Sequence, residues 1–230
     1  MKTERFQLDG LPALLYGESA ARGYIFLHGQ MGRKEEAEAF AQVACPKGYQ
    51  VLSIDLPGHG ERQGRGEELV PWTAMPDIQA AWDWAVRRWG TVSLRANSIG
   101  AYFAMLALDT PDRALLVSPI LDMEGLILTM MGWAGVTEEQ LRERGEIATD
   151  FGQTLSWKYL SWVREHPAHS WSCPVRILYG EGDNMTPRWT VEKYVRRHDA
   201  QLTVLEGGEH WFHTPEQLAA LREWEKSSCC

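Results

Sequence analysis

Residues 91–108 read TVSLRANSIGAYFAMLAL, and more than any other segment they indicate the architecture of the chain. Residues 91–94 have the character of a buried strand, and 101–108 have the apolar spacing of a helix. Between them lies the string Ala96-Asn97-Ser98-Ile99-Gly100. A serine in a sharp strand-to-helix turn projects its hydroxyl away from the backbone, and its neighbours two positions away must be small because strand and helix almost touch. Ala96, where glycine is usual, and Gly100 are small enough, so the stretch predicts that Ser98 is a nucleophile.

A nucleophilic serine needs a base to take its proton and a third group to orient that base. In the fold that carries such a turn, the acid and then the histidine follow the serine along the chain, each on a loop after a later strand. The run 175–179 is followed by Gly180-Glu181-Gly182-Asp183, and 202–205 by Glu206-Gly207-Gly208-Glu209-His210. Both loops leave the same end of a parallel sheet. We therefore predict Asp183 as the acid and His210 as the base.

Strands and helices alternate along the chain, which is typical of a parallel sheet covered on both faces. We predict a single α/β domain over residues 1–230 that opens with a hairpin around Asp9-Gly10. The predicted strands are 6–8, 13–16, 24–27, 51–54, 91–94, 114–117, 175–179 and 202–205. The predicted helices of the core are 35–45, 77–89, 101–108 and one that begins at Thr214-Pro215. At about 122–171 the segments 124–133, 138–144 and 155–165 predict a helical insertion on the edge of the sheet.

The loop after the strand at 24–27 reads His28-Gly29-Gln30-Met31-Gly32. Acyl transfer builds negative charge on a carbonyl oxygen, which two backbone N–H groups can stabilise. The predicted donors are the N–H groups of Gln30 and of Ile99, which follows the nucleophile at a helix N-terminus. His28 has two interpretations, a second base or a structural histidine that holds this loop, and we favour the second.

Five motifs together resemble the α/β-hydrolase superfamily, and within it the small serine carboxylesterases and lysophospholipase-like hydrolases with a helical cap. These motifs are 28–32, Asp55-Leu56-Pro57-Gly58-His59-Gly60, the turn at Ser98, 180–183 and 208–210. The resemblance implies an eight-stranded, mostly parallel sheet, a Ser-His-Asp triad and a cap inserted after the sixth strand, where 122–171 lies. It further implies that 55–60 is a shaped loop beside the pocket and that His59 is structural. Some members of the superfamily place the acid just after the sixth strand, which makes Asp122 the alternative to Asp183.

These residues lead us to expect a serine hydrolase that cleaves carboxylic esters of small or medium size through an acyl-enzyme on Ser98. The alternatives are amide, peptide or thioester bonds, acyl transfer to another acceptor, or a binding protein that keeps the fold without the chemistry. Apolar and aromatic residues near the cap and the histidine loop are the predicted lining of the substrate pocket: Met130, Trp133, Trp157 and Trp211.

The composition of the chain further limits its possible partners, location and cofactors. A net charge of −8 and a pI near 5.4 argue against nucleic acid as a partner. The two arginine pairs, Arg87-Arg88 and Arg196-Arg197, lie in helical patterns, where we interpret them as solvent-exposed helix faces. No signal peptide and no apolar run long enough to span a membrane precede or interrupt the domain, so we expect a cytoplasmic protein. The four cysteines have no metal-ligand spacing, and we expect neither metal nor cofactor. The partner is a small-molecule ester, and the apolar cap suggests a homodimer surface.

Overall fold

The computed structural model describes residues 1–229 and contains an eight-stranded sheet with the order β1-β2-β4-β3-β5-β6-β9-β10. The first two strands pair antiparallel with each other, β2 pairs antiparallel with β4, and the remaining neighbours are parallel. The strands are β1 (Thr3–Leu8), β2 (Leu11–Tyr16), β3 (Arg22–Leu27), β4 (Gln50–Ile54), β5 (Thr91–Asn97), β6 (Ala114–Val117), β9 (Val175–Gly180) and β10 (Gln201–Leu205). The mostly parallel α/β sheet expected from the sequence is thereby confirmed; Cys230 lies outside the described residues.

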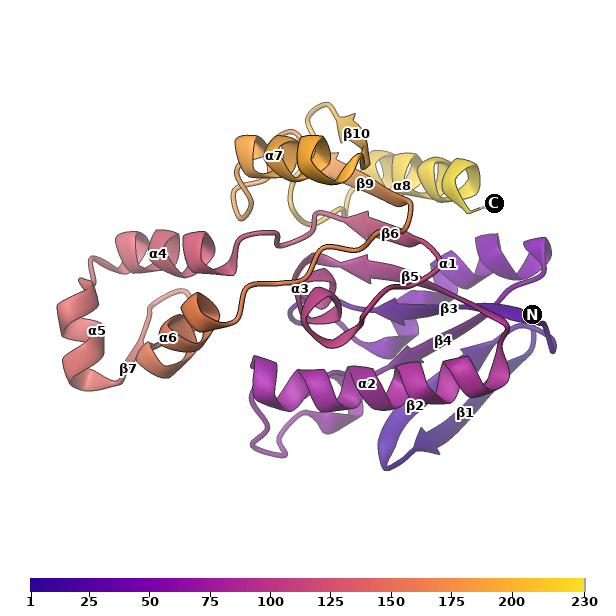
Figure 1. Cartoon of the computed structure of the whole chain (residues 1–230), viewed down its shortest axis with the longest axis horizontal. Coiled ribbons are helices and arrows are strands. Elements are labelled where there is room, and N and C mark those ends of the chain that lie inside the picture. The colour runs from indigo at the N-terminus through magenta and orange to yellow at the C-terminus, as the bar shows by residue number, and fades with distance from the viewer. Residues whose placement is uncertain (230) are drawn as a thin grey trace.

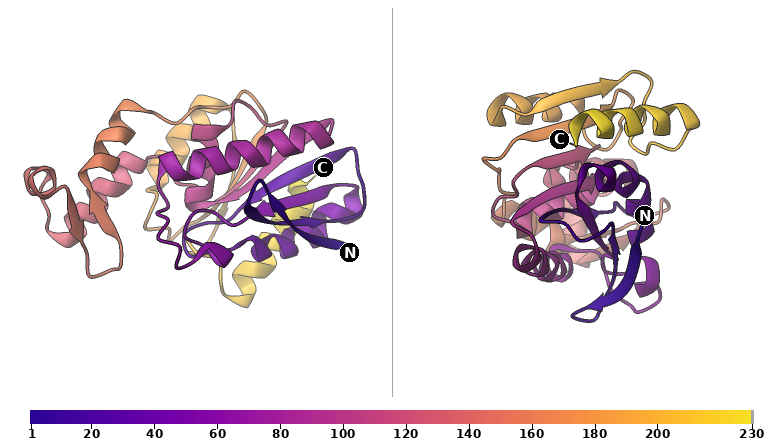
Figure 2. Two further views of the ribbon diagram at one scale, coloured as in Figure 1. Left: turned by 90° about the horizontal axis from the view of Figure 1, so that it is seen from below. Right: turned by 90° about the vertical axis from the view of Figure 1, so that its right-hand side faces the viewer.

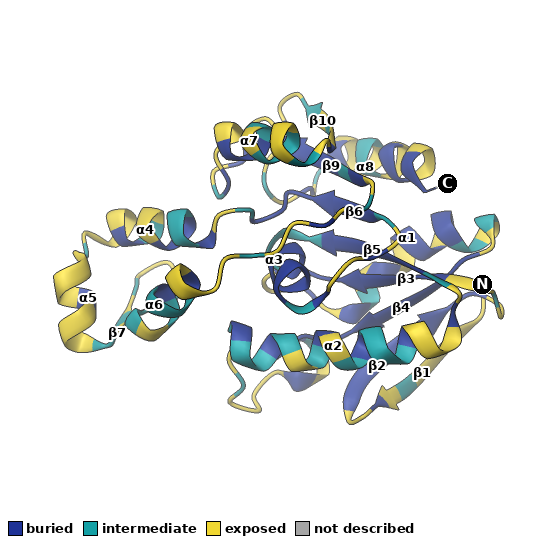
Figure 3. Ribbon diagram, in the orientation of Figure 1, coloured by how far each residue is buried: buried dark blue, intermediate teal, exposed yellow. Residues whose placement is uncertain are grey.

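Helices cover both faces of this sheet (Figures 1 and 2). One buried apolar cluster joins the sheet to α2 (Pro71–Arg88), α3 (Ser98–Ala107) and α7 (Arg188–His198). A second cluster on the other face joins it to α1 (Ala37–Ala44) and α8 (Pro215–Ser228). Strands β4 and β6 are buried along their whole length, and β3 and β5 are buried except at their ends (Figure 3), as expected for parallel strands between two helical layers.

The structure refines several predicted boundaries. Asp9 and Gly10 both have positive φ, 49° and 88°, which is the conformation that a two-residue hairpin turn requires. Helix α2 begins at Pro71, six residues before the predicted start, because Pro71 occupies the first helical turn and a second proline, Pro76, is accommodated inside the helix. The predicted helix at 155–165 begins only at Trp157, since its first two residues belong to a strand.

The segment after β6 extends beyond the carboxyl ends of the strands (Figure 1). It contains α4 (Met123–Ala134), α5 (Glu138–Arg144), a two-stranded hairpin of β7 (Glu146–Ala148) and β8 (Thr154–Ser156), and α6 (Trp157–Glu165). We call residues 122–171 the cap segment. Arg164 joins its three helices by ion pairs with Glu124 and Glu138. The hairpin is a feature that the helical periodicity of the sequence did not predict.

Aromatic contacts connect the cap segment to the core. Trp72, near the start of α2, lies edge-on to Tyr159 and Trp162 of α6, with ring centroids 6.1 and 6.4 Å apart. The ammonium group of Lys158 lies 4.1 Å from the centre of a Trp72 ring, within the range of a cation–π interaction. The indole N–H of Trp171 donates to the carbonyl oxygen of Leu108 at 3.0 Å. These contacts fix both where α6 docks and where the chain returns to the sheet.

No helix within residues 1–229 combines the length and the apolar character needed to cross a bilayer.

Candidate active site

Ser98 is the first residue of α3 and directly follows the last residue of β5. Its φ of 47° lies in the left-handed region, which costs a non-glycine residue on the order of 1–3 kcal/mol and is typical of functional sites. The tightness of the turn is visible at Gly100, where a Cβ atom would collide with the carbonyl oxygen of His28 and lie 3.1 Å from that of Leu27. The strand-to-helix turn predicted at Ser98 is thus present with the steric restriction that the sequence implied.

We expect Gly100→Ala to lower the free energy of unfolding by about 1–3 kcal/mol, the usual cost of forcing a methyl group into a packed site. The backbone oxygen that it meets cannot rotate away, so β3 and α3 must separate. The matched control is Gly132→Ala in α4, where a Cβ meets no atom within 4 Å, and alanine should stabilise the helix by roughly 0.5–1 kcal/mol. Urea denaturation of both variants measures the difference, and an equal effect of the two would contradict the steric explanation.

His210 and Asp183 lie next to Ser98 although they are far from it in sequence. The Oγ atom of Ser98 is 2.8 Å from Nε2 of His210, and Nδ1 of His210 is 2.7 Å from Oδ2 of Asp183. Because a carboxylate only accepts hydrogen bonds, Nδ1 carries the proton and Nε2 is the acceptor for the serine hydroxyl. The arrangement can pass a proton from a hydroxyl to an imidazole whose orientation a carboxylate holds.

The carboxylate of Asp183 is itself fixed by the loop after β9. Its side chain has no exposed surface, and Oδ1 accepts hydrogen bonds from the backbone N–H groups of Met185 and Thr186 at 2.8 and 3.0 Å. The hydroxyl of Thr186 donates to the carbonyl oxygen of Pro119 at 3.0 Å, which ties this loop to the one after β6. Oδ2 is left to face the histidine.

Three other polar residues on the loops of this site have partners of their own. Asp122, the alternative acid, caps the N-terminus of α4 by accepting from the N–H of Gly125 at 2.9 Å. Glu181 is exposed and accepts from the N–H of Gly207 at 3.2 Å. His213 stacks on Trp211, with ring centroids 4.7 Å apart. Among the acids considered from the sequence, Asp183 is the one that the structure brings to His210.

The loop of Gln30 lies against Ser98, because a Cβ atom on Gly29 would be 3.2 Å from that of Ser98. We call residues 28–34 the first loop and residues 55–61 the second loop. They follow β3 and β4, which are parallel neighbours, so both emerge at the same edge of the sheet. The predicted donors Gln30 and Ile99 therefore flank Ser98, one on the first loop and one at the start of α3.

A buried ion pair joins the end of the first loop to the start of the second loop. Lys34 donates from Nζ to Oδ2 of Asp55 at 2.6 Å and from its backbone N–H to Oδ1 at 2.9 Å, and neither side chain is exposed. Glu61 completes the arrangement with a 2.6 Å ion pair to Lys34. Sequence reasoning missed Lys34, since a lone lysine before a helix is normally solvated, and only the acid that begins the second loop hinted at a partner.

His28 is completely buried and forms hydrogen bonds with both loops. Its Nδ1 donates to the carbonyl oxygen of Gly29 at 2.8 Å, and its Nε2 accepts from the backbone N–H of Leu56 at 3.0 Å. Both ring nitrogens are occupied by backbone groups, so His28 has the structural arrangement favoured from the sequence. Burial, which disfavours the charged ring, lowers its pKa from the usual 6.5 to about 4.

The depressed pKa of His28 predicts a loss of stability in acid. Between pH 6.5 and about 4 the unfolded chain binds a proton at His28 that the folded chain excludes, so protonation favours unfolding as the pH falls and has no effect above about pH 7. The shift corresponds to roughly 3 kcal/mol in the free energy of unfolding at the acid end. Urea denaturation across this range should show a shallower pH dependence for His28→Asn than for the wild type, and equal slopes would contradict the assignment.

The four predicted pocket residues occupy different environments. Met130 and Trp157 are half-buried and pack against the main apolar cluster. Trp133 is 49% exposed and lies edge-on to Phe151 within the cap segment, with centroids 5.9 Å apart. Trp211, directly after His210, is 72% exposed. Only Trp211 is adjacent in sequence to a member of the site, and the lining role of all four stays a prediction.

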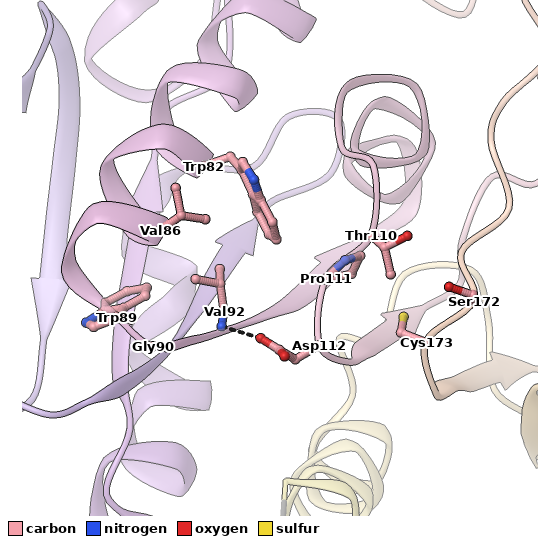
Figure 4. Close-up of a pocket in the computed structure, with 10 residues that line it drawn as sticks. All are labelled: Trp82, Val86, Trp89, Gly90, Val92, Thr110, Pro111, Asp112, Ser172 and Cys173. Atoms are coloured by element: carbon pink, nitrogen blue, oxygen red, sulfur yellow. Dashed lines mark hydrogen bonds between the residues drawn. The ribbon is translucent and has the colours of Figure 1, made fainter.

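A depression of about 430 Å³ lies at the opposite edge of the sheet (Figure 4). Its lining includes Gly90, Asp112 and Cys173, which precede the strands β5, β6 and β9. Ser98, Asp183 and His210 all follow strands, so this depression belongs to the other end of the sheet and is separate from the candidate site. Within residues 1–229 no three His, Cys, Asp or Glu side chains are grouped so that they could hold a metal ion.

The class of α/β hydrolases is defined by a mostly parallel sheet with a serine, a carboxylate and a histidine at one edge. These three residues follow separate strands and occur in that order along the chain. The chain belongs to the alpha/beta hydrolase family, because the sequence profile of that family matches residues 24–221. The resemblance of the motifs to the α/β-hydrolase superfamily is therefore confirmed. Among curated protein sequences, none is significantly similar to this chain.

Solved structures of similar fold cover almost the whole chain. Est1E from Butyrivibrio proteoclasticus, with ferulic acid bound, has a TM-score of 0.76 and 20% identity over 97% of this chain and 96% of its own. A putative hydrolase from Agrobacterium vitis S4 has a TM-score of 0.74 and 17% identity over 98% of both chains. Alpha/beta hydrolase domain-containing protein 10 from mouse has a TM-score of 0.74 and 16% identity, over 99% of this chain and 98% of its own. At these identities the likeness establishes the shared fold.

Proposed function

We propose that this protein is a serine hydrolase that cleaves carboxylic esters with small or medium acyl and alcohol groups. The observation that carries the proposal is the pair of contacts at His210, which lies 2.8 Å from the hydroxyl oxygen of Ser98 and 2.7 Å from the carboxylate of Asp183. These contacts supply a nucleophile, a general base and an orienting acid within hydrogen-bond range. The left-handed conformation of Ser98 supports the same role.

In the proposed reaction, Oγ of Ser98 attacks the ester carbonyl carbon while Nε2 of His210 takes the serine proton. Asp183 stabilises the resulting imidazolium through the hydrogen bond at Nδ1. The N–H groups of Gln30 and Ile99 are the proposed donors to the tetrahedral oxyanion. When the intermediate collapses, His210 returns its proton to the leaving alcohol and an acyl-enzyme remains. A water molecule then attacks the acyl carbon, with His210 again acting as base, and releases the acid and Ser98.

The test is covalent labelling combined with turnover. A fluorophosphonate probe should modify the wild-type chain at Ser98, identified by peptide mass, and p-nitrophenyl esters from acetate to octanoate should be hydrolysed. The panel should include thioesters, amides and feruloyl esters, the last because a fold neighbour binds ferulic acid. Ser172→Ala, at the opposite edge of the sheet, is the matched control and should label normally. A folded wild-type chain that neither labels nor turns over any ester would contradict the proposal and favour a binding protein.

A further inference from the structure

Gln30 lies between two peptide groups, and a histidine holds each of them. The first is the peptide that joins Gly29 to Gln30. Its carbonyl oxygen accepts hydrogen bonds from Nδ1 of His28 at 2.8 Å and from the N–H of Gly32 at 3.1 Å. In a planar trans peptide the N–H points opposite to the C=O. By fixing the carbonyl of Gly29, His28 therefore fixes the direction of the Gln30 N–H.

The second peptide joins Gln30 to Met31, and His59 of the second loop holds it. The N–H of Met31 donates to Nε2 of His59 at 2.9 Å. Met31 has a φ of 62°, a left-handed conformation that an L residue disfavours. The residue is 86% exposed, so buried packing does not compensate for this conformation. The hydrogen bond to His59 is the visible contact that stabilises this conformation.

His59 is in turn anchored within its own loop. Its Nδ1 donates to the carbonyl oxygen of Pro57 at 2.7 Å, and its ring lies 5.3 Å from that of His28. His28 and His59 have the same arrangement with the loops exchanged: each donates from Nδ1 to its own loop and accepts at Nε2 from the other. Since the backbone partners of Nε2 are donors, both rings are neutral in this structure.

We propose that His59, together with His28, is a positioning residue that aims the Gln30 N–H at the oxyanion formed on Ser98. This inference rests on the proposed function. It assigns to the second loop a share in transition-state stabilisation that acts through the backbone of the first loop, without contact to the substrate. The contact that matters is at a different ring atom in each histidine, Nδ1 in His28 and Nε2 in His59.

That difference gives a crossed test with amide replacements. Asparagine places a polar atom near the position of Nδ1, whereas glutamine reaches the position of Nε2. His28→Asn and His59→Gln keep the contact that orients Gln30, and we expect kcat for a p-nitrophenyl ester within about fivefold of the wild type. His28→Gln and His59→Asn lose it, and kcat should fall about 10- to 100-fold with KM nearly unchanged, somewhat less than the loss of a whole donor.

A second readout separates positioning from stability. A trifluoromethyl ketone forms a tetrahedral adduct with an oxyanion, so its inhibition constant should rise by the same factor as kcat/KM falls, while the melting temperature follows a different order. His198→Asn, at the end of α7, is the control histidine. If activity follows the melting temperature in all four variants, or if the crossed pattern is missing, the inference is wrong while the esterase proposal stands.

Inactivity of the wild type would instead overturn the proposed function and this inference with it. If the variants at His28 fail to fold, the comparison of His59→Gln with His59→Asn tests the inference alone, and the same holds with the two positions exchanged. The wild type alone offers a further check, because histidine ¹⁵N chemical shifts report the tautomer. At the pH of full activity both rings should be neutral with the proton on Nδ1, and an imidazolium or the other tautomer at His59 would overturn the assignment.

Discussion

Replacing Ser98 with alanine is expected to lower kcat for ester hydrolysis by about 10⁴- to 10⁶-fold, the range for loss of a triad nucleophile. The change removes the one oxygen that can form the acyl-enzyme. Alanine has the same conformational restriction at a φ of 47°, so the free energy of unfolding should change little. Steady-state kinetics with p-nitrophenyl esters, together with urea denaturation, measures both quantities.

The double variant Ser98→Ala/His210→Ala sharpens this prediction. If Ser98 and His210 act as one unit through their 2.8 Å contact, the double variant should be no slower than Ser98→Ala alone. Additive losses would show that His210 contributes independently and would contradict the proposed proton transfer. Ser172→Ala should retain full activity, which controls for a general effect of removing a hydroxyl.

The sequence was sufficient for features that depend on local spacing. All eight strands of the main sheet follow from apolar runs, most of them ended by a glycine or proline. The same pattern places the turn at Ser98 before the loops of Asp183 and His210. Parallel strands deliver their carboxyl ends to one edge, so three loops that are distant in sequence could be predicted to meet. This inference needed no knowledge of side-chain contacts.

Features that depend on distant pairing were not predictable in the same way. Arg95 is a charged residue in the buried strand β5, and nothing near it in sequence indicates Glu225, its partner 130 residues later. The hairpin β7–β8 consists of three-residue strands, too short for a periodic signal. The docking of α6 on Trp72 depends on how the cap segment packs, which a linear pattern does not encode. The arrangement of the predicted pocket residues stays open for the same reason.

The ion pair of Arg95 and Glu225 is linked to the turn that carries Ser98 through Asn97. Nε of Arg95 is 2.9 Å from Oε1 of Glu225, with side-chain exposures of 2% and 4%. Arg95 also donates from Nη1 to Oδ1 of Asn97 at 2.6 Å, and Asn97 is the residue directly before Ser98. The guanidinium lies 5.4 Å from the ring of Phe26. A buried charge with these contacts is costly to leave without its partner.

We expect Glu225→Gln to lower the free energy of unfolding by about 3–5 kcal/mol, because the buried guanidinium would lose the carboxylate that it contacts directly. Replacing both residues, as Arg95→Met with Glu225→Leu, should be neutral or stabilising by about 1–4 kcal/mol, since neither charge must then be desolvated. Urea denaturation of the two variants and the wild type decides the point. A double variant as unstable as Glu225→Gln would mean that the pair contributes net stability.

Activity of the same double variant shows what the pair contributes besides stability. Without Arg95, the side chain of Asn97 loses its 2.6 Å partner, and the turn that carries Ser98 is less constrained. A shift of about 1 Å at a reacting atom can cost roughly 100-fold in rate. A stable double variant with kcat reduced about tenfold or more would therefore mean that the buried pair serves the geometry of the turn. A stable variant with full activity would instead assign Arg95 and Glu225 to the packing between β5 and α8 alone.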